Sequence, residues 1–325
     1  MLGAAWLEKA TWSTTDIQGG TNGGVLNPEQ TREFLRIAIE QSVLLSEVRN
    51  EFSQSPKFEV PRISLASRVL RAGTEGARLV DADRVKPATG LVTLSTVLFK
   101  GEVPVTDELF EDNIEQDRVA DTIMTMVAEA VGRDVEEILL KSDTARTGAE
   151  DTTLDQLNGI IKKMQTDLPG ARKLNAAAYA DFDELFSTMI ESLPARYRRD
   201  YGALRLYVPT AVKDHYQGSL AARGTGLGDQ AIVQNMSTQL AYRGIPVVDI
   251  PLLAGTDTIN TGAVDYSKYA FLTHPQNIIV GWHRRIRVEK FRDPREGVTS
   301  FLPSLRVDVA MADPDFGVLA FNIGV

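Results

Sequence analysis

The sequence contains no cysteine, only three histidines and no long apolar run. The lack of cysteine excludes disulfide bonds, thiolate zinc sites and a cysteine nucleophile. His215, His274 and His283 leave little for a histidine-rich metal centre, so we predict no metal site and no cofactor. No apolar stretch approaches the roughly 18 residues that a transmembrane helix needs, so we predict no membrane contact.

The charge is mildly acidic, since 35 Lys and Arg oppose 44 Asp and Glu, a net charge of −9 over 325 residues. A general nucleic-acid binder needs clustered Lys and Arg, so this balance argues against one. No cationic segment precedes the short apolar stretch Leu2–Leu7, so we expect no signal peptide. The composition predicts a soluble globular protein that stays inside the cell.

Residues 1–27 read as an arm, because five glycines fall there and four of them lie between Gly19 and Gly24. Trp6 and Trp12 also lie in this arm, where a purely solvated tail would have no use for them. Two interpretations remain open: the indoles fold back on their own subunit, or they anchor the arm on a neighbouring one. Residues 28–51 then predict a helix to about Asn50, capped by Asn27 and started by Pro28.

Residues 52–106 predict a long two-stranded hairpin. Apolar and polar residues alternate around Phe58 and Ile63 and again from Leu91 to Val105, while the stretch between is small, polar and charged. Such a hairpin is marginal alone in water, and little sequence nearby supplies a partner. We therefore expect it to lie on another copy of the chain, which is a sign of assembly.

Residues 113–142 predict one long helix with an apolar stripe, about 45 Å long at ~1.5 Å per residue. Residues 107–143 hold twelve acids and three bases, a charge of −9, whereas residues 52–106 hold eight bases and five acids, a charge of +3. The two segments are complementary surfaces, or the helix has a solvated acidic face beside an unrelated loop. On the first interpretation, hairpin arginines face carboxylates on an adjacent subunit: Arg62, Arg68, Arg71, Arg78 and Arg84 against Asp117, Asp121, Glu129 and Glu136.

The remaining sequence predicts an α+β fold. Helices are expected at 153–167, 177–192, 210–220 and 232–240, and strands at 204–208, 245–250, 269–273, 278–281, 286–292, 304–312 and 317–323.

Motifs that suggest chemistry lack the context that the chemistry needs. Gly224, Gly226 and Gly228 follow a predicted helix, and no Lys-Ser/Thr pair follows them, so they predict a mobile loop rather than a phosphate cradle. Asp315-Phe316-Gly317 matches a kinase triplet, but too little sequence follows for an activation segment. We predict no catalytic residues and no enzyme.

The order of elements resembles the HK97-fold major capsid proteins of tailed bacteriophages. The segments Leu206-Tyr207-Val208-Pro209-Thr210 and Arg243-Gly244-Ile245-Pro246-Val247-Val248 are similar to stretches often seen in the axial domain of that family. The resemblance implies an α+β HK97-like fold with six parts: 1–27 as N-arm, 28–51 as N-terminal helix, 52–106 as E-loop, 107–144 as spine helix of the peripheral domain, 145–275 as mainly axial domain and 276–325 as peripheral return strands.

The resemblance implies a structural role, in which pentamers and hexamers of this chain close an icosahedral shell around double-stranded phage DNA without sequence-specific binding. It places the loop at Gly224, Gly226 and Gly228 at the capsomer centre, and it allows separate scaffolding, portal and decoration proteins as partners. The chain would be made in the bacterial host cytoplasm and reside in the virion. Lys57, Lys86 and Asn322 do not align with the family's cross-linking chemistry, so we predict no covalent cross-link. The alternatives are an encapsulin-like nanocompartment shell and a soluble α+β enzyme.

Overall fold

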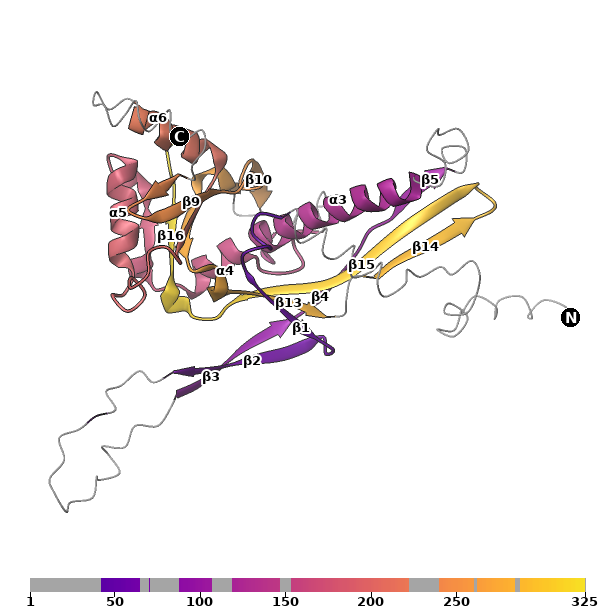
Figure 1. The fold of residues 1–325 in the computed structure, drawn as a ribbon, viewed down its shortest axis with the longest axis horizontal. Coiled ribbons are helices and arrows are strands. Elements are labelled where there is room, and N and C mark those ends of the chain that lie inside the picture. The colour runs from indigo at the N-terminus through magenta and orange to yellow at the C-terminus, as the bar shows by residue number, and fades with distance from the viewer. Residues whose placement is uncertain are drawn as a thin grey trace, which may run out of the picture.

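The computed structural model describes residues 42–64, 70, 88–106, 119–146, 153–221, 240–259, 262–283 and 287–324. They form two larger sheets. One sheet lies along the long helix α3 (Val119–Lys141) in the extended part of the molecule, and the other lies in a lobe at one end (Figure 1). We call them the spine sheet and the lobe sheet.

The spine sheet is built around the long strand β15 (Val298–Met311), in which buried and part-exposed residues alternate from Phe301 to Val307 and every residue from Val307 to Met311 is buried. Strands β13 (Ile278–His283) and β14 (Arg287–Asp293) pair with one side of β15, and β4 (Val97–Lys100) and β5 (Val103–Thr106) pair with its other side. Strand β1 (Arg49–Ser53) adds to β13 in parallel. One continuous strand thus holds four antiparallel partners.

Helix α3 covers one face of the spine sheet. Its buried stripe includes Val135, Ile138 and Leu139, which belong to the same apolar core as Leu305 and Val307 of β15. Burying such side chains contributes about 1.5–3 kcal/mol each, so this core stabilises the extended part of the chain. The shorter helix α4 (Ile160–Asp167) packs beside α3 with Ile160, Ile161 and Met164 in the same core.

The lobe sheet has six strands in the order β6 (Lys173–Asn175), β16 (Gly317–Phe321), β12 (Ala270–Thr273), β7 (Arg205–Val208), β9 (Ile245–Asp249) and β8 (Ala241–Tyr242). Helices α5 (Phe182–Ser192) and α6 (Thr210–Ala221) supply Phe186, Met189 and Val212 to its core. Strands β10 (Thr256–Ile259) and β11 (Gly262–Asp265) form a small separate hairpin. The described residues also include five 3-10 turns, and two of them, η6 (Pro275–Asn277) and η7 (Pro314–Phe316), join the two sheets.

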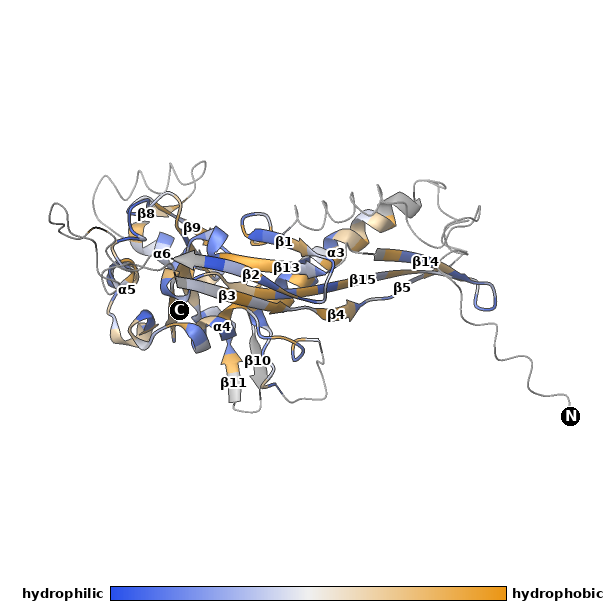
Figure 2. Cartoon of the chain, turned by 90° about the horizontal axis from the view of Figure 1, so that it is seen from below, coloured by the Kyte–Doolittle hydropathy of each residue, from blue (hydrophilic) through white to orange (hydrophobic). Residues whose placement is uncertain are grey.

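A second hairpin, formed by β2 (Lys57–Ser64) and β3 (Ala88–Ser95), crosses the spine sheet on the face away from α3 (Figure 2). Phe58 and Leu94 lie opposite each other at its base and pack on Ile279, Gly281 and Ala310. The base of this hairpin is therefore held by its own chain.

The predicted elements are confirmed for the long helix and for most strands, and they are wrong in three places. The helix predicted to Asn50 is absent at 42–53, which forms turns and then β1. The hairpin predicted over 52–106 ends at Ser95, because β4 and β5 join β15. The last strand, assigned to the peripheral return strands, lies inside the lobe sheet as β16.

Two predicted helices also start later than expected, at Ile160 and Phe182. The first residues of the long helix (113–118), the arm 1–27 and the helix predicted at 232–240, except Leu240, fall outside the described residues.

Candidate assembly surfaces

The spine sheet leaves two large apolar side chains exposed on the side away from α3. In β14, Lys290 pairs with the buried Phe301, so the next residue, Phe291, points to the opposite face, where it is 57% exposed. In β4, Leu98 pairs with Arg306 on that same face and is 44% exposed. We call this surface the open face; it is formed by Leu98, Lys100, Glu289, Phe291, Leu302 and Arg306.

The described part of the hairpin is docked on its own subunit at two points. Ser95 at its base donates its backbone N–H to the buried carboxylate of Asp308, 2.7 Å away. Further along, Arg62 donates to the Ala312 carbonyl at 3.0 Å and pairs with Asp313 at 3.1 Å. The outer side of β3 carries Leu91, which is 63% exposed. The hairpin is thus docked on its own subunit as far as Arg62, with apolar surface still exposed on its outer side.

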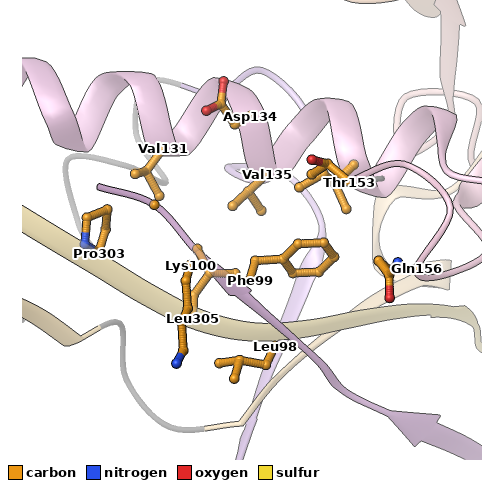
Figure 3. A pocket seen from close by; sticks show the side chains of 12 residues that line it. Leu98, Phe99, Lys100, Val131, Asp134, Val135, Thr153, Gln156, Pro303 and Leu305 are labelled. Carbon is orange, nitrogen blue, oxygen red and sulfur yellow. The ribbon is translucent and has the colours of Figure 1, made fainter. Parts of the chain in front are cut away.

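A groove lies between α3 and the strands beneath it (Figure 3). Val131 and Val135 of α3 face Phe99 and Leu305 across a space of about 440 Å³, and the polar residues Asp134, Thr153 and Gln156 also line it. Burial raises the pKa of Asp134, and Glu137 raises it further, while Arg133 opposes the shift. The groove resembles a packing defect between helix and sheet and carries no constellation suited to catalysis.

No family model matches the sequence. A curated relative does: YqbE of Bacillus subtilis (strain 168), whose name describes it as a prophage capsid protein, is 31% identical over 296 residues, which span 90% of this chain and 91% of that protein. The chain belongs to the phage capsid protein family. The protein is a capsid shell protein, and the resemblance to major capsid proteins is confirmed.

Solved capsid structures share the fold of this phage capsid protein. A chain of the satellite phage P4 procapsid, solved with the size determination (Sid) protein, has a TM-score of 0.67 at 14% identity and covers 92% of this chain and 93% of that one. The SrpI encapsulin of Synechococcus elongatus PCC 7942 has a TM-score of 0.54 at 11% identity and covers 86% of each chain. These likenesses show the fold alone, and the predicted HK97-like α+β fold is confirmed.

The structure describes only some of the predicted contact residues of this capsid protein. Glu129 is exposed on α3, as an inter-subunit contact requires, and the backbone of Asp121 lies in the same helix. The contact of these two carboxylates with hairpin arginines of an adjacent subunit stays a prediction. The other predicted residues lie outside the described ones: Trp6, Trp12, Arg68, Arg71, Arg78, Arg84, Asp117, Gly224, Gly226 and Gly228.

Two predicted contact residues of the capsid protein have partners inside their own chain. Arg62 was predicted to face the spine helix of a neighbouring subunit, but its guanidinium forms an ion pair with Asp313 of the same chain. Glu136 is 4% exposed and accepts the Leu44 N–H at 2.7 Å, so its prediction as a surface contact is wrong. A charge count finds carboxylates along a helix but does not show which of them face inward.

Glu136 instead joins α3 to the segment that precedes β1. Burial raises the pKa of this carboxyl, and hydrogen bonds from Leu44, Ser42 and Val43 oppose the shift only partly. The same segment reaches the lobe, because Glu47 accepts hydrogen bonds from Tyr207 at 2.9 Å and Arg205 at 3.2 Å. Burial, with the Glu47 charge beside it, raises the pKa of Tyr207, so its hydroxyl keeps the proton that it donates.

Within the ranges that the structure describes, no helix is both long and apolar enough to cross a membrane. Over the same part of the chain, His, Asp and Glu side chains form no group of three that could hold a metal ion.

Proposed function

We propose that this capsid protein is the major head protein of a tailed phage and builds an icosahedral shell of pentamers and hexamers around double-stranded DNA. The observation that supports this is that two separate surfaces of one subunit, the open face and the outer side of the hairpin, leave apolar side chains exposed. Phe291 and Leu98 leave apolar surface on the open face, and Leu91 leaves it on the hairpin. Two different complementary patches on one chain make head-to-tail contacts, which close into rings.

In this proposal the spine sheet and α3 form the peripheral domain, and the lobe forms the axial domain at the capsomer centre. The part of the hairpin beyond Arg62 lies on a neighbour, where Arg68, Arg71, Arg78 and Arg84 meet carboxylates such as Asp117, Asp121 and Glu129 on α3 or before it. Exposed ion pairs contribute about 0.2–1 kcal/mol each, so the shell relies on their number and on buried apolar area. The arm with Trp6 and Trp12 straps a further subunit.

The proposal includes no enzymatic step. The net charge of −9 suits a container, because strong attraction for packaged DNA would oppose its release. A separate scaffolding protein, a portal and a decoration protein are proposed as partners, and the host cytoplasm as the place of synthesis.

Electron microscopy of the purified full-length protein, combined with light scattering, tests the proposal. We expect the purified protein to form shells with icosahedral symmetry. We expect shells isolated from infected or induced cells to protect double-stranded DNA. Shells that hold a cargo enzyme and no DNA would instead support the encapsulin alternative. A protein that stays monomeric at all concentrations and shows an enzymatic activity would contradict both shell proposals.

A further inference from the structure

Two short crossovers carry the chain between the lobe sheet and the spine sheet. One runs through η6 between β12 and β13, and the other runs through Ala312, Asp313 and η7 between β15 and β16. The buried side chain of Asn277 joins them: its oxygen accepts the Asp313 N–H at 2.8 Å, and its amide donates to the Asp313 and Phe316 carbonyls. The crossovers therefore form one bonded unit between the two sheets.

Asp313 stands at the surface of this unit with both carboxylate oxygens engaged. Oδ1 pairs with Arg62 of the hairpin at 3.1 Å and accepts the Asp315 N–H at 3.0 Å, and Oδ2 accepts the hydroxyl of Tyr197 from the lobe. The Arg62 side chain lies beside Gly90, its cross-strand partner. One side chain thus joins the hairpin, the crossover and the lobe.

The contact with the lobe is well held. The ring of Tyr197 stacks on the ring of Phe316, with the two ring centroids 4.2 Å apart. The guanidinium carbon of Arg196 lies over the Tyr197 ring, 4.5 Å from the ring centroid. Asp315, two residues after Asp313, pairs with Arg172 at 2.9 Å and Arg196 at 3.2 Å. A displacement of Asp313 therefore moves Tyr197 and its neighbours with it.

The protonation states suit these contacts. Burial raises the pKa of Asp313, but the hydrogen bond from Tyr197, the Asp315 N–H and the charges of Arg62 and Arg196 outweigh it, and the net shift is downward. Burial and the Asp313 carboxylate raise the pKa of Tyr197 to about 12. At neutral pH the carboxylate is charged and the phenol is a donor.

We infer that Asp313 is a coupling residue that links the direction of the hairpin to the position of the lobe. A neighbouring subunit that binds the hairpin and displaces it therefore also displaces the lobe. The inference rests on the proposed function only in the identity of that neighbour, a second copy of this chain. The coupling itself belongs to one subunit. Coupling between two sites is reciprocal, so a change at the lobe must also reach the hairpin.

Hydrogen–deuterium exchange on the full-length protein, with all variants in the same assembly state, tests the inference in both directions. Arg62→Gln removes the ion pair to Asp313, and we expect lobe amides at 195–200 to exchange about two- to five-fold faster. Tyr197→Phe removes only the hydroxyl, and we expect hairpin amides at 90–95 to exchange faster by a similar factor.

The matched control is Arg49→Gln. The Arg49 side chain is 44% exposed against 42% for Arg62, and it pairs with Glu51 of its own strand, so the control removes an ion pair that joins no separate elements. Lobe exchange that is equal in the Arg62 and Arg49 variants, or a Tyr197→Phe variant with an unchanged hairpin, would overturn the coupling. Neither result depends on shell formation, so the proposed function fails or stands separately.

Discussion

Gly281 lies directly against the ring of Phe58: a Cβ atom on Gly281 would stand 2.7 Å from Phe58 Cζ and 3.3 Å from Leu94 Cδ1. This close approach brings the base of the hairpin onto β13. The two strands of the hairpin have no apolar core of their own, so this contact fixes where they rest.

Gly281→Ala should lift or distort the hairpin base. Overpacking of a filled core costs about 1–3 kcal/mol. Rotation of the Phe58 ring cannot relieve the contact, because Cζ lies on the rotation axis, so the hairpin or β13 must shift. The measurement is the free energy of unfolding in denaturant, with the exchange of amides 90–95 as a local readout. Gly170→Ala is the control, because a Cβ there meets nothing within 4 Å. Equal unfolding energies for the two variants would show that the contact does not hold the hairpin.

Glu136→Gln should change how stability depends on pH. The pKa of Glu136 is raised in the folded chain, so the folded state holds its proton above the ordinary value of 4.5, and stability falls as pH rises through that window. Glutamine keeps an acceptor for the Leu44 N–H but never ionises. We expect the variant to be more stable than wild type at neutral pH and to lose this advantage below about pH 4.5. Exposed Glu129→Gln on the same helix is the control; a variant that gains no stability at neutral pH contradicts the burial argument.

Asn277→Ala should weaken the joint between the two sheets. It leaves the Asp313 N–H and the carbonyls of Asp313 and Phe316 without their amide partner in a buried place, at about 1–3 kcal/mol for each group that stays unsatisfied. Thermal unfolding should shift to lower temperature, and the two sheets should lose exchange protection at the crossovers first. Asn277→Asp keeps the acceptor and loses the donors, so an intermediate loss is expected; no loss in either variant would refute this role.

Phe291→Ser combined with Leu98→Ser should block assembly without unfolding the subunit. Both side chains are about half exposed in the single chain, so their loss costs little folding energy, while an interface that buries them loses apolar area. Sedimentation measures the shell fraction, and circular dichroism checks the fold. Tyr201→Ser, at a lobe residue that is 40% exposed, serves as the control. Normal shells from the double variant would remove the open face from the proposal.

Reversal of Arg71 and Arg78 to Glu should slow or abolish assembly, because it places acids from the hairpin against the acids of the spine helix. Wild-type assembly should weaken as salt rises, since screening reduces attraction between exposed charges. Light scattering during assembly follows both effects. Assembly rates that stay unchanged in the variant at low and at high salt would refute the pairing.

Periodicity in the sequence predicts individual elements well in this chain. The apolar stripe of α3 and the alternation along the middle of β15 are set by local side-chain patterns, which follow directly from helix and strand geometry. The order of these elements was sufficient for the family, because few folds place a long hairpin before a long acidic helix.

Pairing partners could not be predicted, since alternation shows that a segment is a strand but not which strand lies beside it. The strand β16 was therefore placed in the wrong sheet, and β4 and β5 were placed in the hairpin. Asp313 was not singled out, because its role depends on residues 62 and 197, which only the fold brings together. The only local sign of this role in the sequence was that Asp313 belongs to the short segment Asp313-Pro314-Asp315, which holds two acidic residues.

The central strand of the spine sheet and an inner strand of the lobe sheet are β15 and β16, which follow every other described element along the chain. During synthesis, β15 and β16 therefore leave the ribosome one after the other, after the long helix and the hairpin have been made. Neither sheet is complete before that moment. A chain that stops before β15 lacks a strand of each sheet, so one truncation impairs both parts of the subunit.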